Sequence, residues 1–238
     1  MDLSVVIPLH NEEGNVERLL ATLGESLERD SLVGRFEVVC VNDGSNDGTA
    51  AQLERHRADW VTVITLPTRR GQSTALSYGL DAARYDVLAR MDGDLQTTPE
   101  DFERLLPLLE QGFDCVHGIR VKRHDSMVRR WSSLIANAVR RAVLRDGFQD
   151  IACPLTVFRR ACLERVPRFE PFHRYLPFLI SMQGFAVTQV PVRHFPRLAG
   201  RAKYGIANRL AIGLTSLFVI RWLSRHVVAR RPAAGGHS

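Results

Sequence analysis

The first half of the chain alternates short apolar runs with amphipathic runs. Five apolar runs have the length and composition of β-strands, and the first two are separated by a stripe of apolar side chains with helical spacing. The strand candidates are residues 3–7, 36–41, 61–66, 87–89 and 115–117, and the stripe consists of Val16, Leu19, Leu20, Leu23 and Leu27. Strands that alternate with helices predict an α/β fold with a mainly parallel sheet.

Another helix is expected to begin at Thr98. A hydroxyl side chain suits the cap, Pro99 suits the first turn, and Glu100 and Asp101 suit the positive end of the helix dipole. The buried face of this helix is predicted to consist of Phe102, Leu105, Leu106 and Leu109.

Length and composition fit one globular domain with a short appendage. The 238 residues are 45% hydrophobic, which is enough for a substantial core. The four cysteines lack metal-ligand spacing and are expected to be reduced and buried. The start of the chain has neither the basic segment nor the apolar core of a signal peptide, which predicts a cytoplasmic location.

Charge is distributed unevenly along the chain. Residues 1–114 carry 10 basic and 21 acidic side chains, whereas residues 115–238 carry 22 basic and 5 acidic ones. The second half is therefore expected to meet an anionic partner, which could be a phosphate group, an anionic lipid surface or a nucleic acid.

The second half contains two arginine-rich segments with helical patterns, residues 127–144 and 207–228. The uncharged stretch 210–220 has eleven residues, whereas a membrane-spanning helix needs about 20. Trp222 and several arginines follow it, which indicates an amphipathic helix lying in a membrane interface. The alternative is an ordinary terminal helix packed on the domain.

Polar residues follow three of the predicted strands. Asp92 and Asp94, with Gly93 between them, can hold a hard divalent cation at the carboxyl edge of a sheet, although such a pair alone is often only a turn. Asp43 can accept hydrogen bonds from a nucleobase, or the turn that contains it can cap a helix. The residues 8–13 form a third polar strand end. Three such ends in succession predict a ligand site.

Several common enzyme signatures are missing from the sequence. It has no G-x-G-x-x-G after the first strand, no P-loop, no G-x-S-x-G and no H-E-x-x-H. These absences disfavour classical dinucleotide-binding enzymes, P-loop enzymes, and the common hydrolases and metalloproteases.

Four motifs occur in order along the first half of the chain. They are I-P-L-H-N-E at residues 7–12, V-N-D-G-S with D-G-T at 41–49, R-R-G-Q at 69–72, and M-D-G-D-L-Q at 91–96. This ordered set resembles the family 2 glycosyltransferases, and within them the dolichol- and undecaprenyl-phosphate sugar synthases. The resemblance covers nearly the whole chain. It implies a GT-A fold, a GDP- or UDP-linked sugar as donor, and Mg²⁺ or Mn²⁺.

The resemblance also assigns roles in the donor half. The residues placed at the nucleotide sugar are Pro8, His10, Glu12, Val41, Asp43, Asp92 and Gly93, and those placed at the metal are Asp94 and Gln96. His10 stands where the family more often has Tyr, and Asn42 stands where a second Asp is common.

The resemblance continues into the second half. It implies that Arg120, Arg130 and Ser133 receive the acceptor phosphate and that Arg197 and Lys203 approach the donor phosphates. Asp150 stands near the acceptor and is grouped with Asp94 and Arg120 as catalytic. An ionised phosphate needs little help from a base, so Asp150 either orients the acceptor or deprotonates it. Any single arginine here could also lie on a solvated helix face.

The sequence thus predicts a metal-dependent inverting glycosyltransferase that acts on a polyprenyl phosphate at the cytoplasmic membrane face. The predicted divisions are a GT-A domain at 1–205, with a nucleotide-sugar half at 1–120 and an acceptor half at 121–205, an interfacial helix at 206–231, and a disordered tail at 232–238. Peripheral attachment to an anionic membrane surface is expected, and a separate membrane-protein partner could supply transmembrane helices.

Two other functions compete with this interpretation. A family 2 enzyme could glycosylate a sugar hydroxyl of a lipopolysaccharide or polysaccharide, but that reaction needs a firm base and does not need the basic second half. A basic nucleic-acid-binding protein is disfavoured because aromatic residues are not interleaved with the basic ones. We therefore expect no nucleic-acid partner.

Overall fold

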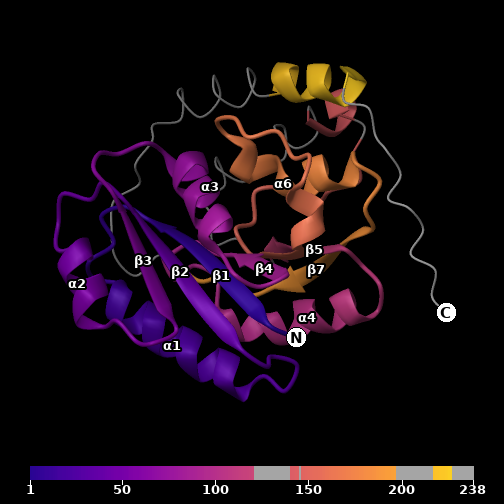
Figure 1. The fold of residues 1–238 in the computed structure, drawn as a ribbon. Coiled ribbons are helices and arrows are strands. Elements are labelled where there is room, and N and C mark those ends of the chain that lie inside the picture. Colours follow the sequence, from indigo (N-terminus) through magenta and orange to yellow (C-terminus); the bar gives the residue numbers. More distant parts are fainter. Residues whose placement is uncertain (121–139, 145, 197–216, 227–238) are drawn as a thin grey trace.

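Seven strands form one central sheet in the computed structural model, which describes residues 1–120, 140–144, 146–196 and 217–226 (Figure 1). Their spatial order is β3-β2-β1-β4-β6-β5-β7. The strands are β1 (Leu3–Leu9), β2 (Phe36–Asp43), β3 (Val61–Leu66), β4 (Val87–Arg90), β5 (Cys115–Arg120), β6 (Thr156–Arg159) and β7 (Val187–Val192). Within this sheet β6 is antiparallel to β4 and β5, and the other neighbours are parallel. The predicted mainly parallel sheet is confirmed.

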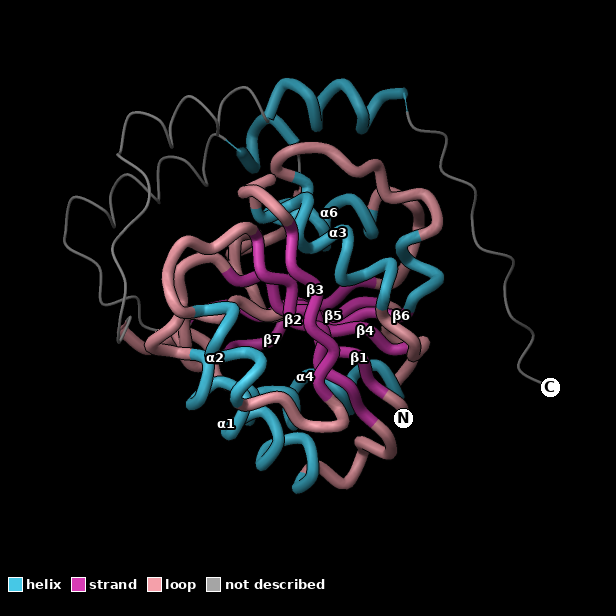
Figure 2. Tube along the Cα trace, turned by 60° about the vertical axis from the view of Figure 1, so that its left-hand side comes forward, coloured by secondary structure: helices cyan, strands magenta, loops and turns pink. Residues whose placement is uncertain are grey.

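Helices cover both faces of the sheet. The α-helices are α1 (Val16–Arg29), α2 (Thr49–Arg55), α3 (Gln72–Ala82), α4 (Phe102–Glu110) and α6 (Phe172–Ser181), and the 3₁₀ turns are η1 (Pro99–Asp101) and η2 (Arg160–Leu163). Figure 2 shows α1, α2 and α4 on one face and α3 and α6 on the other. Residues 140–144 and 217–226 are also helical.

The core consists of two apolar clusters, one on each face of the sheet. Val5 and Ile7 of β1 pack in the cluster with α1 and α4, whereas Val6, between them, packs in the cluster with α3 and α6. Alternation of this kind is what a strand buried on both sides requires. A Cβ at Gly79 of α3 would lie 2.3 Å from Val6 Cγ1, so this glycine lets α3 approach the sheet closely.

The five predicted strands are all present, and four of them run one to three residues further than their apolar runs. In β2 the extension contains Asn42 and Asp43, which pair with β3 while carrying polar side chains to the sheet edge. The sequence analysis did not identify β6 or β7. The stripe on α1 and the buried face of α4 are confirmed.

The expected cap at Thr98 is not formed. The Thr98 side chain makes no capping hydrogen bond, and the segment begins as the 3₁₀ turn η1, closed by a backbone bond from Asp101 N–H to the Thr98 carbonyl. The four cysteines are free and buried, as expected, and burial raises the pKa of Cys40 to about 12.

The described part of the C-terminal helix has one side on the domain and one in solvent. Leu217 is 8% exposed and packs with Ile220 in the α3/α6 cluster, whereas Phe218 is 75% and Trp222 60% exposed. Across the described ranges, no helix combines the length and apolar composition needed to span a bilayer. Positions 206–216 and 227–238 lie outside the described residues, and so does the tail 232–238.

Candidate functional site

The carboxyl ends of β1, β2 and β4 meet at one edge of the sheet, where the first three polar strand ends were predicted. His10 Nδ1 lies 2.8 Å from the Asp43 carbonyl oxygen and so joins the ends of β1 and β2. Asn11 after β1 and Leu95 after β4 have φ angles of 55° and 58°. Non-glycine residues in this left-handed region cluster at functional sites, where the surrounding structure holds them.

The turns after β1 and β2 are held together by hydrogen bonds from backbone N–H groups to hydroxyl side chains. Asn11 N–H donates to Ser45 Oγ at 3.0 Å, and Glu12 N–H donates to Thr49 Oγ1 at 2.9 Å. Glu12 Oε2 also accepts a bond from Asn15 Nδ2 at 2.7 Å, which orients its carboxylate. The motif residues around positions 10–12 and 45–49 therefore form one network before any ligand is considered.

Asp43 uses both carboxylate oxygens to hold the loop between β3 and α3. Arg70 N–H donates to Oδ1 at 2.6 Å and Gly71 N–H donates to Oδ2 at 2.9 Å. Gly44, with φ +56°, lies beneath the same loop, and a Cβ there would come within 2.4 Å of the Thr68–Arg69 backbone. A contact between Asp43 and a nucleobase stays a prediction, and the residue has a structural function in addition.

The turn after β4 rests on β1 and faces α3. A Cβ at Gly93 would lie 2.1 Å from Leu9 Cδ2, so the turn can reach β1 because Gly93 has no side chain. Gln72 Nε2, at the start of α3, donates to Asp92 Oδ1 at 2.7 Å. This contact turns Asp92 toward the loop that Asp43 holds, and it brings the second, third and fourth sequence motifs together.

Asp94 and Gln96 leave the same short turn and can offer oxygen atoms to a cation. Gln96 N–H donates to Asp94 Oδ1 at 3.1 Å, and Gln96 Nε2 faces the Phe195 carbonyl at 3.5 Å, which leaves the carboxamide oxygen for a metal. In the described part of the chain no cluster of three or more His, Cys, Asp or Glu residues could hold a metal ion. Carboxylate and amide oxygens suit Mg²⁺ or Mn²⁺, which can take further ligands from phosphates and water, and the assignment of the metal to Asp94 and Gln96 stays a prediction.

Arg120 and Asp150 form a bidentate ion pair at the end of β5. Arg120 Nε and Nη2 donate to the two Asp150 oxygens at 2.7 and 2.9 Å, and both side chains are largely buried. His117 Nε2 bonds the Asp150 carbonyl oxygen at 2.7 Å, and burial lowers the pKa of His117 to about 4. Asp150 is thus engaged by a cation, and this geometry suits an orienting role better than that of a base.

A second ion pair connects the end of β7 to the turn that follows Gln96. The fully buried carboxylate of Asp101 accepts bonds from Arg193 N–H at 2.7 Å and Nε at 2.9 Å, and Arg193 Nη1 lies 2.8 Å from Glu100. Phe195 N–H then donates to the Gln96 carbonyl at 2.9 Å. Sequence analysis missed this pair, because 92 residues separate its members.

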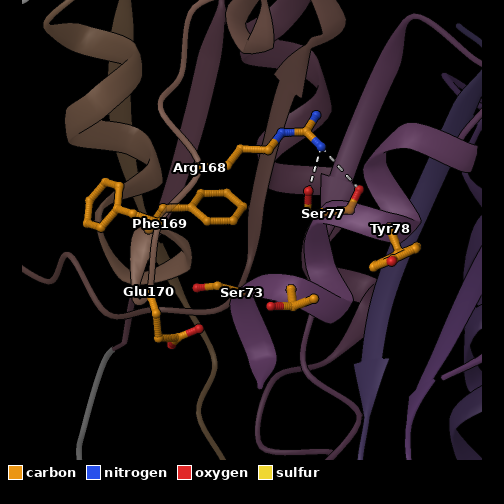
Figure 3. Close-up of a pocket in the computed structure, with 8 residues that line it drawn as sticks. Ser73, Ser77, Tyr78, Arg168, Phe169 and Glu170 are labelled. Atoms are coloured by element: carbon orange, nitrogen blue, oxygen red, sulfur yellow. Dashed lines mark hydrogen bonds between the residues drawn. The ribbon is translucent and has the colours of Figure 1, made fainter. Parts of the chain in front are cut away.

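A pocket of about 180 Å³ lies between α3 and the segment before α6 (Figure 3). Arg168 hydrogen bonds Ser77 Oγ at its rim, while Ser73 and Glu170 lie at the end nearest Gly71. Ser73 Oγ lies 2.6 Å from His173 Nδ1, which ties α3 to α6 beside the loop between β3 and α3.

The remaining candidate residues are placed as follows. Pro8 pairs with Val41 across β1 and β2, and Val41 is fully buried, with its side chain near Gly79, so neither its side chain nor its backbone is exposed to a ligand. Arg130, Ser133, Arg197 and Lys203 lie outside the described residues.

Several curated proteins with similar sequences are named undecaprenyl-phosphate 4-deoxy-4-formamido-L-arabinose transferase. The protein of this name from Pseudomonas aeruginosa (strain LESB58) is 36% identical over 216 residues, which is 87% of this chain and 62% of the relative. That from Pseudomonas savastanoi pv. phaseolicola is 34% identical over 206 residues, 85% of this chain and 60% of the relative. The chain thus spans about three fifths of the length of these relatives.

Solved structures share the fold. A mannosyltransferase from Pyrobaculum calidifontis in complex with GDP-Man and Mn²⁺ has a TM-score of 0.70 at 22% identity, covering 96% of this chain and 65% of that one. Glucosyl-3-phosphoglycerate synthase from Mycobacterium tuberculosis, in complex with Mn²⁺, UDP-glucose and glycerol 3-phosphate, has a TM-score of 0.69 at 20% identity, covering 98% and 82%. The expected GT-A fold is confirmed. The model of the family "Glycosyl transferase family 2" matches residues 4–166, and the chain belongs to that family.

Proposed function

We propose that the chain transfers a sugar from a nucleoside-diphosphate sugar to a polyprenyl phosphate, with inversion. The observation that carries this proposal is the convergence of the donor motifs at the ends of β1, β2 and β4, with the Arg120–Asp150 pair at the end of β5. The relatives are named as undecaprenyl-phosphate transferases, and this supports a polyprenyl phosphate as the acceptor.

The donor is expected to lie over the ends of β1, β2 and β4. His10, Glu12 and Asp43 would face the base and ribose, and Asp92, held by Gln72, would contact the nucleoside. Mg²⁺ or Mn²⁺ on Asp94 and Gln96 would supply positive charge to the diphosphate as it leaves. Arg197 and Lys203 are proposed to approach the same phosphates.

The acceptor phosphate is expected to lie near Arg120, with Arg130 and Ser133 as further contacts. Asp150 holds the Arg120 guanidinium by two hydrogen bonds, so this fork is already oriented for a phosphate that approaches its remaining donors. A phosphate oxygen is ionised near neutral pH and attacks without a strong base. A sugar hydroxyl acceptor would need such a base, and engagement of Asp150 by Arg120 disfavours that reaction.

We further propose that the chain works at the cytoplasmic face of a membrane as a peripheral protein. In the helix 217–226, buried Leu217 and Ile220 attach one side to the domain, while Phe218 and Trp222 project into solvent beside Arg221 and Arg225. Exposed aromatic residues next to arginines suit an anionic lipid interface. A separate membrane-protein partner stays a prediction.

The deciding experiment is a donor screen with Mn²⁺ and a short-chain polyprenyl phosphate. UDP- and GDP-linked sugars are supplied in turn, and the release of nucleoside diphosphate is measured with and without the acceptor. Acceptor-dependent release that stops in excess EDTA supports the proposal. Release that needs a sugar hydroxyl in place of the lipid phosphate, or none with any donor, contradicts it.

A further inference from the structure

Arg90 is a buried cation at the centre of the candidate site. It is the last residue of β4, where it lies beside Val6 of β1 and Thr156 of β6, and it is only 3% exposed. Its Nη1 atom has no hydrogen-bond partner among the residues that the structure describes. Burial of a guanidinium with an unmatched donor is costly, so a chain that keeps one there is expected to gain something from its charge.

The side chain of Arg90 lies behind Asp92. Leu88 and Arg90 point to the same face of the sheet, because side chains alternate along a strand, and Leu88 packs in the cluster with α3 and α6. Asp92 turns to that face as well, since Gln72 at the start of α3 donates to its carboxylate. Burial lowers the pKa of Arg90, and the charge of Asp92 is the largest influence that opposes this shift.

Among the charges that shift the pKa of Arg90, Asp92 supplies the main negative one, and the nearby arginines add positive ones. His117 and His173 are buried, and burial, reinforced by the Arg90 charge, lowers the pKa of His117 to about 4 and that of His173 well below its usual value. Both histidines are therefore neutral near pH 7. Arg120 is paired by Asp150, and Arg174 adds further positive potential.

We infer that Arg90 is an electrostatic residue of the donor site, whose buried charge helps the sheet edge to hold the negatively charged diphosphate of a nucleotide. Asp92 and Asp94 lie at this edge and repel such an anion, whereas a fixed cation behind them offsets the repulsion in a poorly solvated environment. The inference rests on the proposed function for the class of donor. It predicts that the contribution of Arg90 grows with the negative charge of the ligand.

A charge series of ligands tests this dependence. The ligands are a nucleoside, its diphosphate with Mn²⁺, and the same diphosphate in EDTA, with net charges of 0, about −1 and about −3 at pH 8. UDP or GDP is chosen according to which binds the wild type. Calorimetry on the full chain compares the wild type with Arg90→Gln and Arg90→Lys. Arg57→Gln is the matched control, since Arg57 is an exposed arginine paired only with Glu54 among the described residues.

For Arg90→Gln we expect unchanged nucleoside affinity, about threefold weaker binding of the Mn²⁺ complex, and at least tenfold weaker binding in EDTA. Arg90→Lys should stay within about threefold of the wild type for every ligand. The control Arg57→Gln should bind every ligand as the wild type does. Equal losses for all three ligands, or no loss, would overturn the inference while leaving the transfer proposal intact. A wild type that binds no nucleotide with or without Mn²⁺ would contradict both the inference about Arg90 and the transfer proposal.

Discussion

The two halves of the site edge are built by different kinds of contact. On the proposed donor side, at β1, β2 and β4, carboxylates are held by backbone N–H groups and short polar side chains, as Asp43 is by Arg70 and Gly71. On the acceptor side, at β5 and β7, acids are held by arginines, as Asp150 is by Arg120 and Asp101 by Arg193. Acids on the proposed donor side are therefore oriented mainly by neutral donors, whereas those on the proposed acceptor side are oriented by arginine guanidinium groups.

The largest effect is expected from the metal position on the donor side. Asp94→Ala should lower transfer roughly 10²- to 10³-fold, because it removes the carboxylate that stabilises charge on the leaving diphosphate through the metal. Release of nucleoside diphosphate at saturating Mn²⁺ measures this. Asp86→Ala is the control, as the Asp86 side chain is 99% exposed and its ion pair with Arg160, in the part of the chain that the structure describes, is a long one of 3.8 Å. Normal turnover by the Asp94 variant would contradict the assignment of Asp94 as a metal ligand.

On the acceptor side the expected effect is on stability first. Arg193→Ala leaves the fully buried Asp101 carboxylate without the Nε donor and the charge of Arg193, while the backbone N–H of residue 193 still donates to it, and breaking a buried pair costs about 3–5 kcal/mol of unfolding free energy. The partial exposure of Arg193 places the cost toward the lower end. Urea unfolding measures it, and Arg104→Ala, which removes a longer contact to Asp101, should cost less than 1 kcal/mol. Equal costs for the two variants would mean that Arg193 does not stabilise the contact between the end of β7 and the turn at Asp101.

The contrast between the halves also explains what the sequence could predict. The residues of the donor side lie in short motifs, so Asp92, Asp94 and the turn at Asp43 could be located from the ends of the predicted strands alone. The acceptor side depends on partners that are far apart, such as Arg193 and Asp101, and no spacing in the sequence connects them. The strands β6 and β7 were missed because their patterns are weak: β6 is only four residues long, and Pro191 lies inside β7.

Loop geometry on the donor side gives a smaller but sharper effect. Gly44→Ala should cost about 1–3 kcal/mol and weaken donor binding, because φ is +56° and the new Cβ would meet the Thr68–Arg69 backbone. Gly112→Ala is matched to it, since φ is +98° there and the Cβ would meet no atom within 4 Å. Thermal unfolding and nucleotide affinity are measured for both. Loss of affinity in both variants would show that backbone strain alone, and not the loop held by Asp43, explains the result.

The smallest effect is expected in the helix 217–226, whose exposed side is compared with its buried side for binding to a membrane. Phe218→Ser with Trp222→Ser should lower binding to anionic liposomes severalfold with little change in melting temperature, because both side chains are exposed and their apolar contact with lipid would be lost. Leu217→Ser should do the reverse, since Leu217 packs in the α3/α6 cluster and its loss leaves a cavity. Liposome sedimentation and thermal unfolding of the same three proteins separate the two sides of the helix. If the exposed pair lowers the melting temperature and leaves liposome binding intact, this helix is only a part of the domain. The basic acceptor side would then have to find its anionic partner at Arg120 and its neighbours alone.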